Sequence, residues 1–255
     1  MNHEKASDKD RDMSTISALL QPFQTYLTPM RGDHDTAERR AAITRMLATR
    51  YLAWDQLRKH LFNPRQFPAL PRNESVIALA RQLSQFGWIH SSHPTHSVWQ
   101  LDAASPDEIV YLRGGWLEEY TWLGYRAAGC DEAYFAQKVR WTVGDTEGDN
   151  EIDVIARRGN QLSFASCKSI RPEAESNGER MREFVHELLS WDLHFADTEA
   201  KTLLVTTADL IDETRGNLAR HPTLLARATV YDLDIVGLED LGWKRFVQAI
   251  EAHWD

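Results

Sequence analysis

Two acids and a lysine are spaced so that one helix and two strands could bring them together. Glu118 lies in the run GGWLEEY, Asp153 in the run NEIDV, and Lys168 ends a third stretch, QLSFASCK. Carboxylate oxygens are the ligands that Mg²⁺ prefers, and a lysine beside a metal-bound water can orient that water or stabilise developing negative charge. These residue types suit metal-dependent hydrolysis of a phosphodiester bond.

The local pattern predicts the elements that would position these side chains. From Trp116 onward, apolar residues recur at helical spacing, and Gly129 is a plausible end of the helix. The two glycines at 114–115 are expected to interrupt whatever element precedes the helix. Three strands should follow, over residues 134–143, 152–155 and 162–167, with a polar turn region at 144–149. Because strand side chains alternate, Asp153 lies beside Lys168 if the last two strands pair.

The chain beyond Lys168 continues the alternation of helices and strands. The pattern predicts a helix at 179–196, a buried strand at 202–206, a loop with a short helix at 209–219, a strand at 228–236 and a closing helix at 238–254. The order from Trp116 onward is therefore αβββαβ with additions.

These motifs resemble the PD-(D/E)XK nuclease superfamily. Taken in order, they are most similar to the nuclease domain of CRISPR-associated effectors that carry a Rossmann-type sensor for cyclic oligonucleotides, and they cover about a quarter of the chain. The resemblance implies an α/β fold with a restriction-endonuclease-like core. It also implies an endonuclease that hydrolyses DNA or RNA with Mg²⁺ or Mn²⁺, in phage defence. We expect no sensor domain here, because no Rossmann glycine pattern follows a strand before residue 114.

The resemblance also assigns roles within the site. Asp153 is expected to be the central metal ligand, with the carbonyl of Cys167 and an acid of the helix assisting. Of the two helix acids, Glu118 matches the Leu-Glu pair of the family, so Glu119 should face solvent or a cation. Lys168 is expected to act on the attacking water or on the charge of the transition state.

One position departs from the family pattern, because Ser166 stands where an acid is expected. A neutral hydroxyl is a poor substitute for a carboxylate as a magnesium ligand. Either the site is weakened or inactive, or another acid reaches in from the following helix. Glu183 and Glu187 share a face of that helix and are the candidates.

Basic residues surround the proposed site and could contact phosphates of a nucleic acid. They are Lys138, Arg140, Arg157, Arg158, Arg171, Arg180 and Arg182. A solvated strand edge is an equally good explanation, since basic residues also discourage edge pairing. The net charge of −9 argues against broad, non-specific nucleic-acid affinity but leaves room for a local basic groove.

The 255 residues suggest three segments. Residues 1–33 are expected to be loosely ordered, residues 34–110 form a helical, winged-helix-like unit, and residues 111–255 form the nuclease-like domain. The helix predicted at 74–86 carries a single cation, Arg81, so a spacer or dimerisation role is favoured over DNA reading. We expect a homodimer.

Two cysteines give no disulfide framework, and the charged N-terminus has no apolar signal core. No apolar run is long enough to cross a membrane, so we expect a cytoplasmic protein without a membrane partner. Two hypotheses of function remain open. The first is the metal-dependent endonuclease. The second is a nuclease-like module that has lost or weakened its catalysis and binds nucleic acid or a protein partner.

Overall fold

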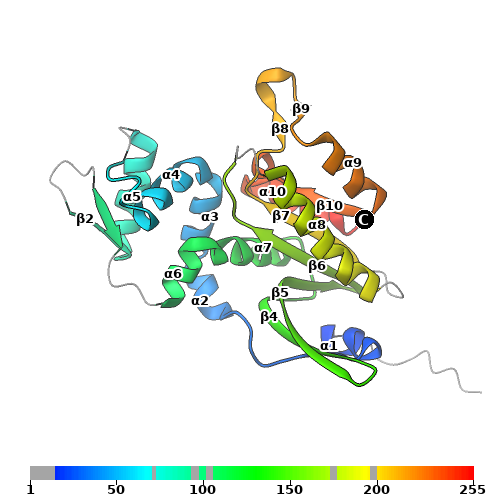
Figure 1. The fold of residues 1–255 in the computed structure, drawn as a ribbon. Coiled ribbons are helices and arrows are strands. Elements are labelled where there is room, and N and C mark those ends of the chain that lie inside the picture. Colours follow the sequence, from blue (N-terminus) through cyan, green and yellow to red (C-terminus); the bar gives the residue numbers. More distant parts are fainter. Residues whose placement is uncertain (1–14, 71–72, 93–97, 102–105, 173–176, 196–199) are drawn as a thin grey trace, which may run out of the picture.

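The computed structural model describes residues 15–70, 73–92, 98–101, 106–172, 177–195 and 200–255. Its centre is a six-stranded mixed sheet (Figure 1). In spatial order the strands are β1 (Thr25–Leu27), β4 (Glu132–Val143), β5 (Thr146–Arg158), β6 (Gln161–Lys168), β7 (Lys201–Thr206) and β10 (Leu233–Val236). The first four strands pair antiparallel, and β6, β7 and β10 pair parallel. The sequence-predicted order αβββαβ is therefore confirmed, from the first helix of the core to β7.

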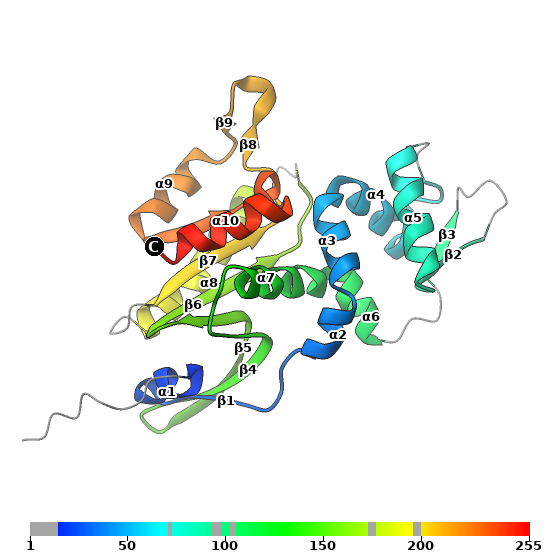
Figure 2. The ribbon, with the colours of Figure 1, turned by 180° about the vertical axis from the view of Figure 1, so that it is seen from behind.

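Helices cover both faces of this sheet. On one face, α7 (Trp116–Ala127) and α10 (Trp243–His253) pack with strand residues such as Val154 and Ala165. On the other face lie α8 (Asn177–His194) and α9 (Pro222–Val230), as Figure 2 shows from behind. Alternation along the strands puts Asp153, Ser166 and Lys168 on the α8 face, because Ile155 and Phe164 belong to that side.

The N-terminal helices pack against the start of α7 (Figure 1). They are α2 (His34–Arg39), α3 (Ala41–Thr49), α4 (Tyr51–Phe62) and α5 (Glu74–Gln85), followed by a hairpin of β2 (Ile89–Ser91) and β3 (Trp99–Leu101). Helices followed by a two-stranded hairpin agree with the predicted winged-helix-like order. A single apolar cluster runs from these helices through α7 to α10, so they share one core with the sheet.

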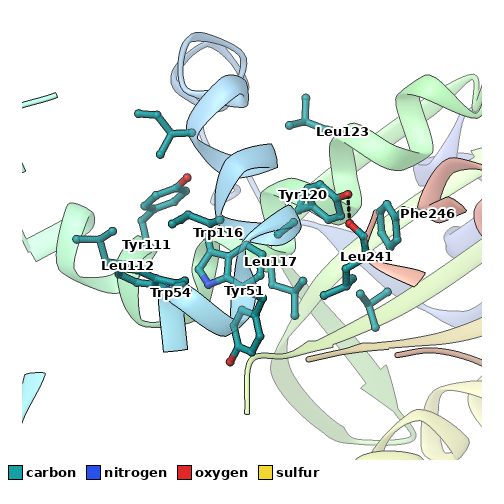
Figure 3. Close-up of a cluster of buried hydrophobic side chains, with 14 of the residues drawn as sticks. Tyr51, Trp54, Tyr111, Leu112, Trp116, Leu117, Tyr120, Leu123, Leu241 and Phe246 are labelled. Atoms are coloured by element: carbon teal, nitrogen blue, oxygen red, sulfur yellow. Dashed lines mark hydrogen bonds between the residues drawn. The ribbon is translucent and has the colours of Figure 1, made fainter. Parts of the chain in front are cut away.

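Helix α7 is buried on nearly every side, which marks it as the centre of the molecule. Tyr51 and Trp54 of α4 pack beside Trp116 at one end (Figure 3). One turn further along, Tyr120 stacks on Phe246, and its hydroxyl donates a hydrogen bond of 2.7 Å to a backbone carbonyl. The helix can approach α10 closely because residue 124 is glycine.

A buried chain of hydrogen bonds also ties α10 to the sheet. The hydroxyl of Tyr125 lies 2.6 Å from that of Ser163, which lies 2.7 Å from Nε2 of His253. The other ring nitrogen of His253 lies 2.6 Å from a carboxylate oxygen of Asp234. Although serine, histidine and aspartate follow one another here, Ser163 is fully buried, so the chain serves to hold α10 in place.

Four expectations from the sequence need correction. Residues 15–33 are not loosely ordered, because α1 (Ile16–Leu20) docks under the sheet and β1 pairs with β4, while the part of this expectation on residues 1–14 lies outside the described residues. The glycines at 114–115 do not interrupt the chain, since α6 (Pro106–Val110), a π-helical turn (Tyr111–Gly115) and α7 run on continuously. The boundary expected between 110 and 111 therefore lies within a helical stretch.

The other two corrections concern strand limits. The polar stretch at 144–149 is mostly strand, because β5 begins at residue 146 and pairs along β4. The strand expected at 228–236 is only β10, and residues 222–230 form α9, which starts with a proline in its first turn. In residues 209–219 the expected short helix is present as a 3-10 turn (Glu213–Arg215), which joins β8 (Ile211–Asp212) and β9 (Leu218–Ala219) of a small hairpin. No helix among the described residues is long and apolar enough to cross a membrane.

Candidate active site

Asp153 sits where β5 and β6 part. Val154 pairs with Ala165 at the end of the ladder between β5 and β6. One residue earlier on β5, it is the side-chain carboxylate of Asp153, not its backbone, that bonds to β6. It accepts a hydrogen bond of 2.7 Å from the backbone N–H of Cys167 and one of 3.4 Å from the hydroxyl of Ser166. The carboxylate is therefore held in place by β6 itself, and its second oxygen has no hydrogen bond or ion pair to any residue that the structure describes.

Lys168 joins Asp153 to helix α8. Its Nζ lies 3.5 Å from Asp153 and 3.3 Å from a carboxylate oxygen of Glu187, over the ring of Phe184. Burial alone would lower the pKa of Lys168, but the two carboxylates outweigh burial and raise its pKa. The lysine therefore carries its positive charge at neutral pH, beside two acids, as the alternating pattern predicts.

Glu118 reaches the same region from α7, across the other face of the sheet. Burial, followed by the negative charges of Asp153 and Glu151, raises the pKa of Glu118 to about 8. Its neighbour Glu119 turns away and forms a bidentate ion pair with Arg40 of the N-terminal helices, with N···O distances of 2.9 and 3.1 Å from Nε. Glu119 thus faces a cation, which is one of the two environments predicted for it.

The two candidates for a migrated acid differ in position. Glu187 contacts Lys168 and borders, with Asp153 and Ser166, a narrow cavity of about 10 Å³. That volume has room for about one water molecule. Glu183 is exposed one turn earlier on α8 and has no ion pair or hydrogen bond to any other residue that the structure describes. The geometry therefore brings Glu187 to the site and leaves Glu183 outside it.

The remaining predicted residues of β6 face opposite sides of the sheet. Ser166 is 5% exposed and points toward Asp153. The thiol of Cys167 points toward α7 and donates to the hydroxyl of Thr121 at 3.3 Å. Burial, followed by the negative charge of Asp153, raises the pKa of this thiol well above its ordinary value, so the sulfur stays protonated. A role for the backbone carbonyl of Cys167 stays a prediction.

The donor groups match a hard divalent cation in kind, since all are carboxylate oxygens. Burial first, and then the charges of Asp153 and Glu151, raise the pKa of Glu118 to about 8 despite the opposite effect of Lys168, so this carboxyl is largely protonated at neutral pH. In this structure, however, no three His, Cys, Asp or Glu side chains among the described residues converge on one point that could hold a metal ion. A bound cation would use the second carboxylate oxygen of Asp153, because the first accepts from Cys167 and faces Lys168.

Glu151 is a site residue that the sequence predictions missed. It stands two positions before Asp153 on the same face of β5, borders the same narrow cavity and contributes to the raised pKa of Glu118. Strand alternation would have found it, because residues two apart share a face.

Most of the predicted phosphate-binding cations do not gather at this site. Arg157 pairs with Asp131 at 3.1 Å, and Arg158 pairs with Asp255 at 3.1 Å, both at the opposite end of β5. Three others keep to the surface: Arg140 pairs with Asp149, Arg182 lies 3.9 Å from Glu179, and Arg180 is exposed. Lys138 lies opposite Glu151 across the ladder between β4 and β5, and Arg171 follows Lys168 by three residues.

The fold has solved relatives of low sequence identity. VC1899 from Vibrio cholerae superposes with a TM-score of 0.66 at 15% identity. Can2 from Sulfobacillus thermosulfidooxidans, solved in complex with cyclic tetra-adenylate (cA4), superposes with a TM-score of 0.62 at 14% identity. Each comparison covers 94% of this chain, which spans 62% of the first structure and 61% of the second. At such identities the likeness shows a shared fold.

No curated protein matches the chain by sequence. A family model described as "Card1-like, endonuclease domain" matches residues 107–245, which include every residue of the candidate site. The resemblance drawn from the three motifs is thereby confirmed. Because the match spans more than half of the chain, this protein belongs to the family of Card1-like endonuclease domains.

Proposed function

We propose that this protein is an endonuclease that hydrolyses phosphodiester bonds of DNA or RNA with Mg²⁺ or Mn²⁺. The observation that carries the proposal is the meeting of Glu118, Asp153 and Lys168 at one place, from a helix and two strands. Lys168 offers a positive charge there, and burial, together with the charges of Asp153 and Glu151, raises the pKa of Glu118 to about 8, so a bound cation would displace a proton from this carboxyl. Such a cluster fits a cation on one side and a developing oxyanion on the other.

The residues would divide the work as follows. Asp153 and Glu118 would hold the cation through hard oxygen ligands, and Lys168 would orient the attacking water or stabilise charge on the phosphate. A bound divalent ion supplies Lewis-acid charge and lowers the pKa of a coordinated water. Ser166 keeps Asp153 in place by donating to it, which is support that a neutral side chain can give.

We further propose that Glu187 supplies the carboxylate that position 166 lacks. It already lies 3.3 Å from Lys168 and shares the narrow cavity with Asp153. Its side chain is 54% exposed, so it can change rotamer without disturbing the core. A role in phage defence, as in the CRISPR-associated effectors whose motifs it resembles, is part of this proposal. The Can2 structure, which holds cyclic tetra-adenylate, makes activation by a cyclic nucleotide in a longer assembly the natural hypothesis to examine.

A second candidate function is supported by the serine at position 166. If no helix acid replaces the expected carboxylate, the protein is a module that binds nucleic acid or a protein partner without cleaving. Asp153 pairs with Lys168, and position 166 offers no further carboxylate beside them, which agrees with this alternative.

A cleavage assay in Mn²⁺ on labelled single- and double-stranded DNA and RNA separates the two. We expect cleavage by the wild type and a loss of about a hundredfold or more in Asp153→Asn and in Lys168→Ala. Asp149→Asn, an exposed aspartate four residues before Asp153 on β5, is the matched control and should cleave normally. Wild-type-like cleavage by both site variants would reject the assignment, and no cleavage by any of the proteins would favour the binding module.

A further inference from the structure

An open, basic pocket lies where α4 meets the chain just beyond Lys168. It has a volume of about 340 Å³ and is lined by Asp55, Arg58, Lys59, Phe62, Asn63, Arg113 and Arg171. Four of these side chains are cations and one is an acid, in a protein whose net charge is −9. This is a local concentration of positive charge against the overall balance of the molecule.

One half of the pocket is a fixed scaffold. Asp55 is buried and binds both Arg58, at 3.0 Å, and Lys59. Arg58 also donates a hydrogen bond of 3.0 Å to the hydroxyl of Ser169, the residue after Lys168. The hydroxyl of Tyr51 donates to the carbonyl of Ile170 at 2.6 Å, so α4 holds the end of β6 in place.

The other half carries charge without a compensating acid. The guanidinium of Arg113 lies 5.1 Å above the ring of Phe62, and Arg171 is exposed in the loop after β6. Neither side chain forms an ion pair with any acid in the part of the chain that the structure describes. Two such cations facing one pocket repel each other, and an anion between them would relieve that repulsion.

The pocket is also close to the proposed site along the chain. Arg113 precedes Glu118 by five residues of continuous helix, which is about 8 Å along the axis. Arg171 follows Lys168 by three residues, a reach of at most about 11 Å. Successive phosphates of a stacked strand advance by about 3.4 Å each, so the pocket lies on the order of two or three nucleotides from the site.

We propose that this pocket binds a backbone phosphate of the nucleic-acid strand and so positions the strand for the site next to it. Arg113 and Arg171 would contact the phosphate oxygens, while Arg58 and Asp55 hold the pocket in shape. The N-terminal helices then take part in binding the substrate. Only the identity of the anion as a nucleic-acid strand rests on the proposed function.

The test measures binding apart from cleavage. In an Asp153→Asn background without divalent ions, Arg113→Gln combined with Arg171→Gln should weaken binding of a labelled oligonucleotide about tenfold or more. The slope of log affinity against log salt should become shallower by about 0.7 to 0.9 for each phosphate that the protein no longer neutralises. Arg81→Gln combined with Lys244→Gln removes two exposed cations elsewhere and should leave both quantities unchanged. The pair Arg113→Lys and Arg171→Lys should restore much of the binding.

Each other outcome has a meaning. Unchanged binding in the double variant, or an equal loss in the control pair, would overturn the pocket. A further result would also overturn the proposal. If calorimetry shows that inorganic phosphate binds through the pocket while the double variant keeps its affinity for the oligonucleotide, the ligand of the pocket is a small ion. If the wild type binds through the pocket but never cleaves, the proposed function fails and this inference stands. If the wild type cleaves but its oligonucleotide affinity does not depend on Arg113 and Arg171, this inference fails and the proposed function stands.

Discussion

At the scale of single residues, the buried carboxyl of Glu118 makes the free energy of unfolding depend on pH. Its pKa in the folded protein is about 8 against an ordinary value of 4.5, so the folded state holds a proton that the unfolded state has lost. Stability should therefore fall as pH rises from about 5 to about 8 when no divalent ion is present. Glu118→Gln removes this term and should be the more stable protein at about pH 8.

Thermal unfolding in a chelator, over a series of pH values, measures this effect. Glu179→Gln, a surface change on α8, serves as the control and should follow the wild type. If the melting temperatures of the wild type and of Glu118→Gln change in parallel over the whole pH series, the fold does not raise the pKa of Glu118.

Also at the residue scale, substitutions at Glu187 and Ser166 test whether an acid of α8 completes the site. Glu187→Gln should lower activity by about tenfold or more if this acid completes the site. Ser166→Glu should be neutral or harmful, since position 166 is 5% exposed and the adjoining space is about 10 Å³. Glu183→Gln is the control, because that side chain is exposed and lies outside the site. Full activity in Glu187→Gln together with a gain in Ser166→Glu would show that no acid has migrated.

At the scale of elements, the close packing of α7 on α10 depends on Gly124. A Cβ atom there would lie 2.5 Å from a ring carbon of Phe246 and 2.6 Å from Ile250. Gly124→Ala should therefore destabilise the fold by about 1 to 3 kcal/mol, despite the better helix propensity of alanine. Gly115→Ala, whose new Cβ would lie 3.6 Å from the nearest atom, should be neutral or stabilising. Denaturant unfolding of the two variants compares them directly, and equal stabilities would contradict this account.

The elements also show what the sequence could and could not predict. Asp153 and Lys168 were placed correctly because strand alternation and a single turn connect them. The strand expected at 228–236 is confirmed only at Leu233–Val236, because the alternation with Asp232 and Asp234 does not reveal that α9 continues to Val230. Strand β1 could not be foreseen, since three residues gain their strand geometry from β4, more than a hundred positions later.

At the scale of the whole molecule, long-range contacts decide what local patterns cannot. Nothing near Glu119 in the sequence predicts that Arg40 binds it, 79 residues away. The scaffold of the basic pocket was missed for the same reason, because Arg58 and Ser169 are 111 residues apart. Of its cations, sequence reasoning selected only Arg171, the one next to a motif.

The hydrogen-bonded chain through His253 gives a prediction at this scale. His253→Ala leaves the buried hydroxyl of Ser163 with Tyr125 as its one remaining partner among the described residues and opens space beneath α10. We expect a loss of about 2 to 4 kcal/mol in the free energy of unfolding. His186→Ala, at an exposed site on α8, should change it by less than about 0.5 kcal/mol. Urea unfolding decides the matter, and similar midpoints for both variants would contradict a structural role for the chain.

Helix α7 carries Glu118 toward the site and Glu119 toward Arg40 on consecutive residues. An inserted or deleted residue turns everything beyond it by about 100° around the helix axis. Before Glu118, such a change would turn both acids away from their partners, and beyond Glu119 it would turn Gly124 away from α10. Helix α7 is therefore constrained in its length as well as in its buried residues, and a library of single-residue insertions should show a sharp drop in tolerance there.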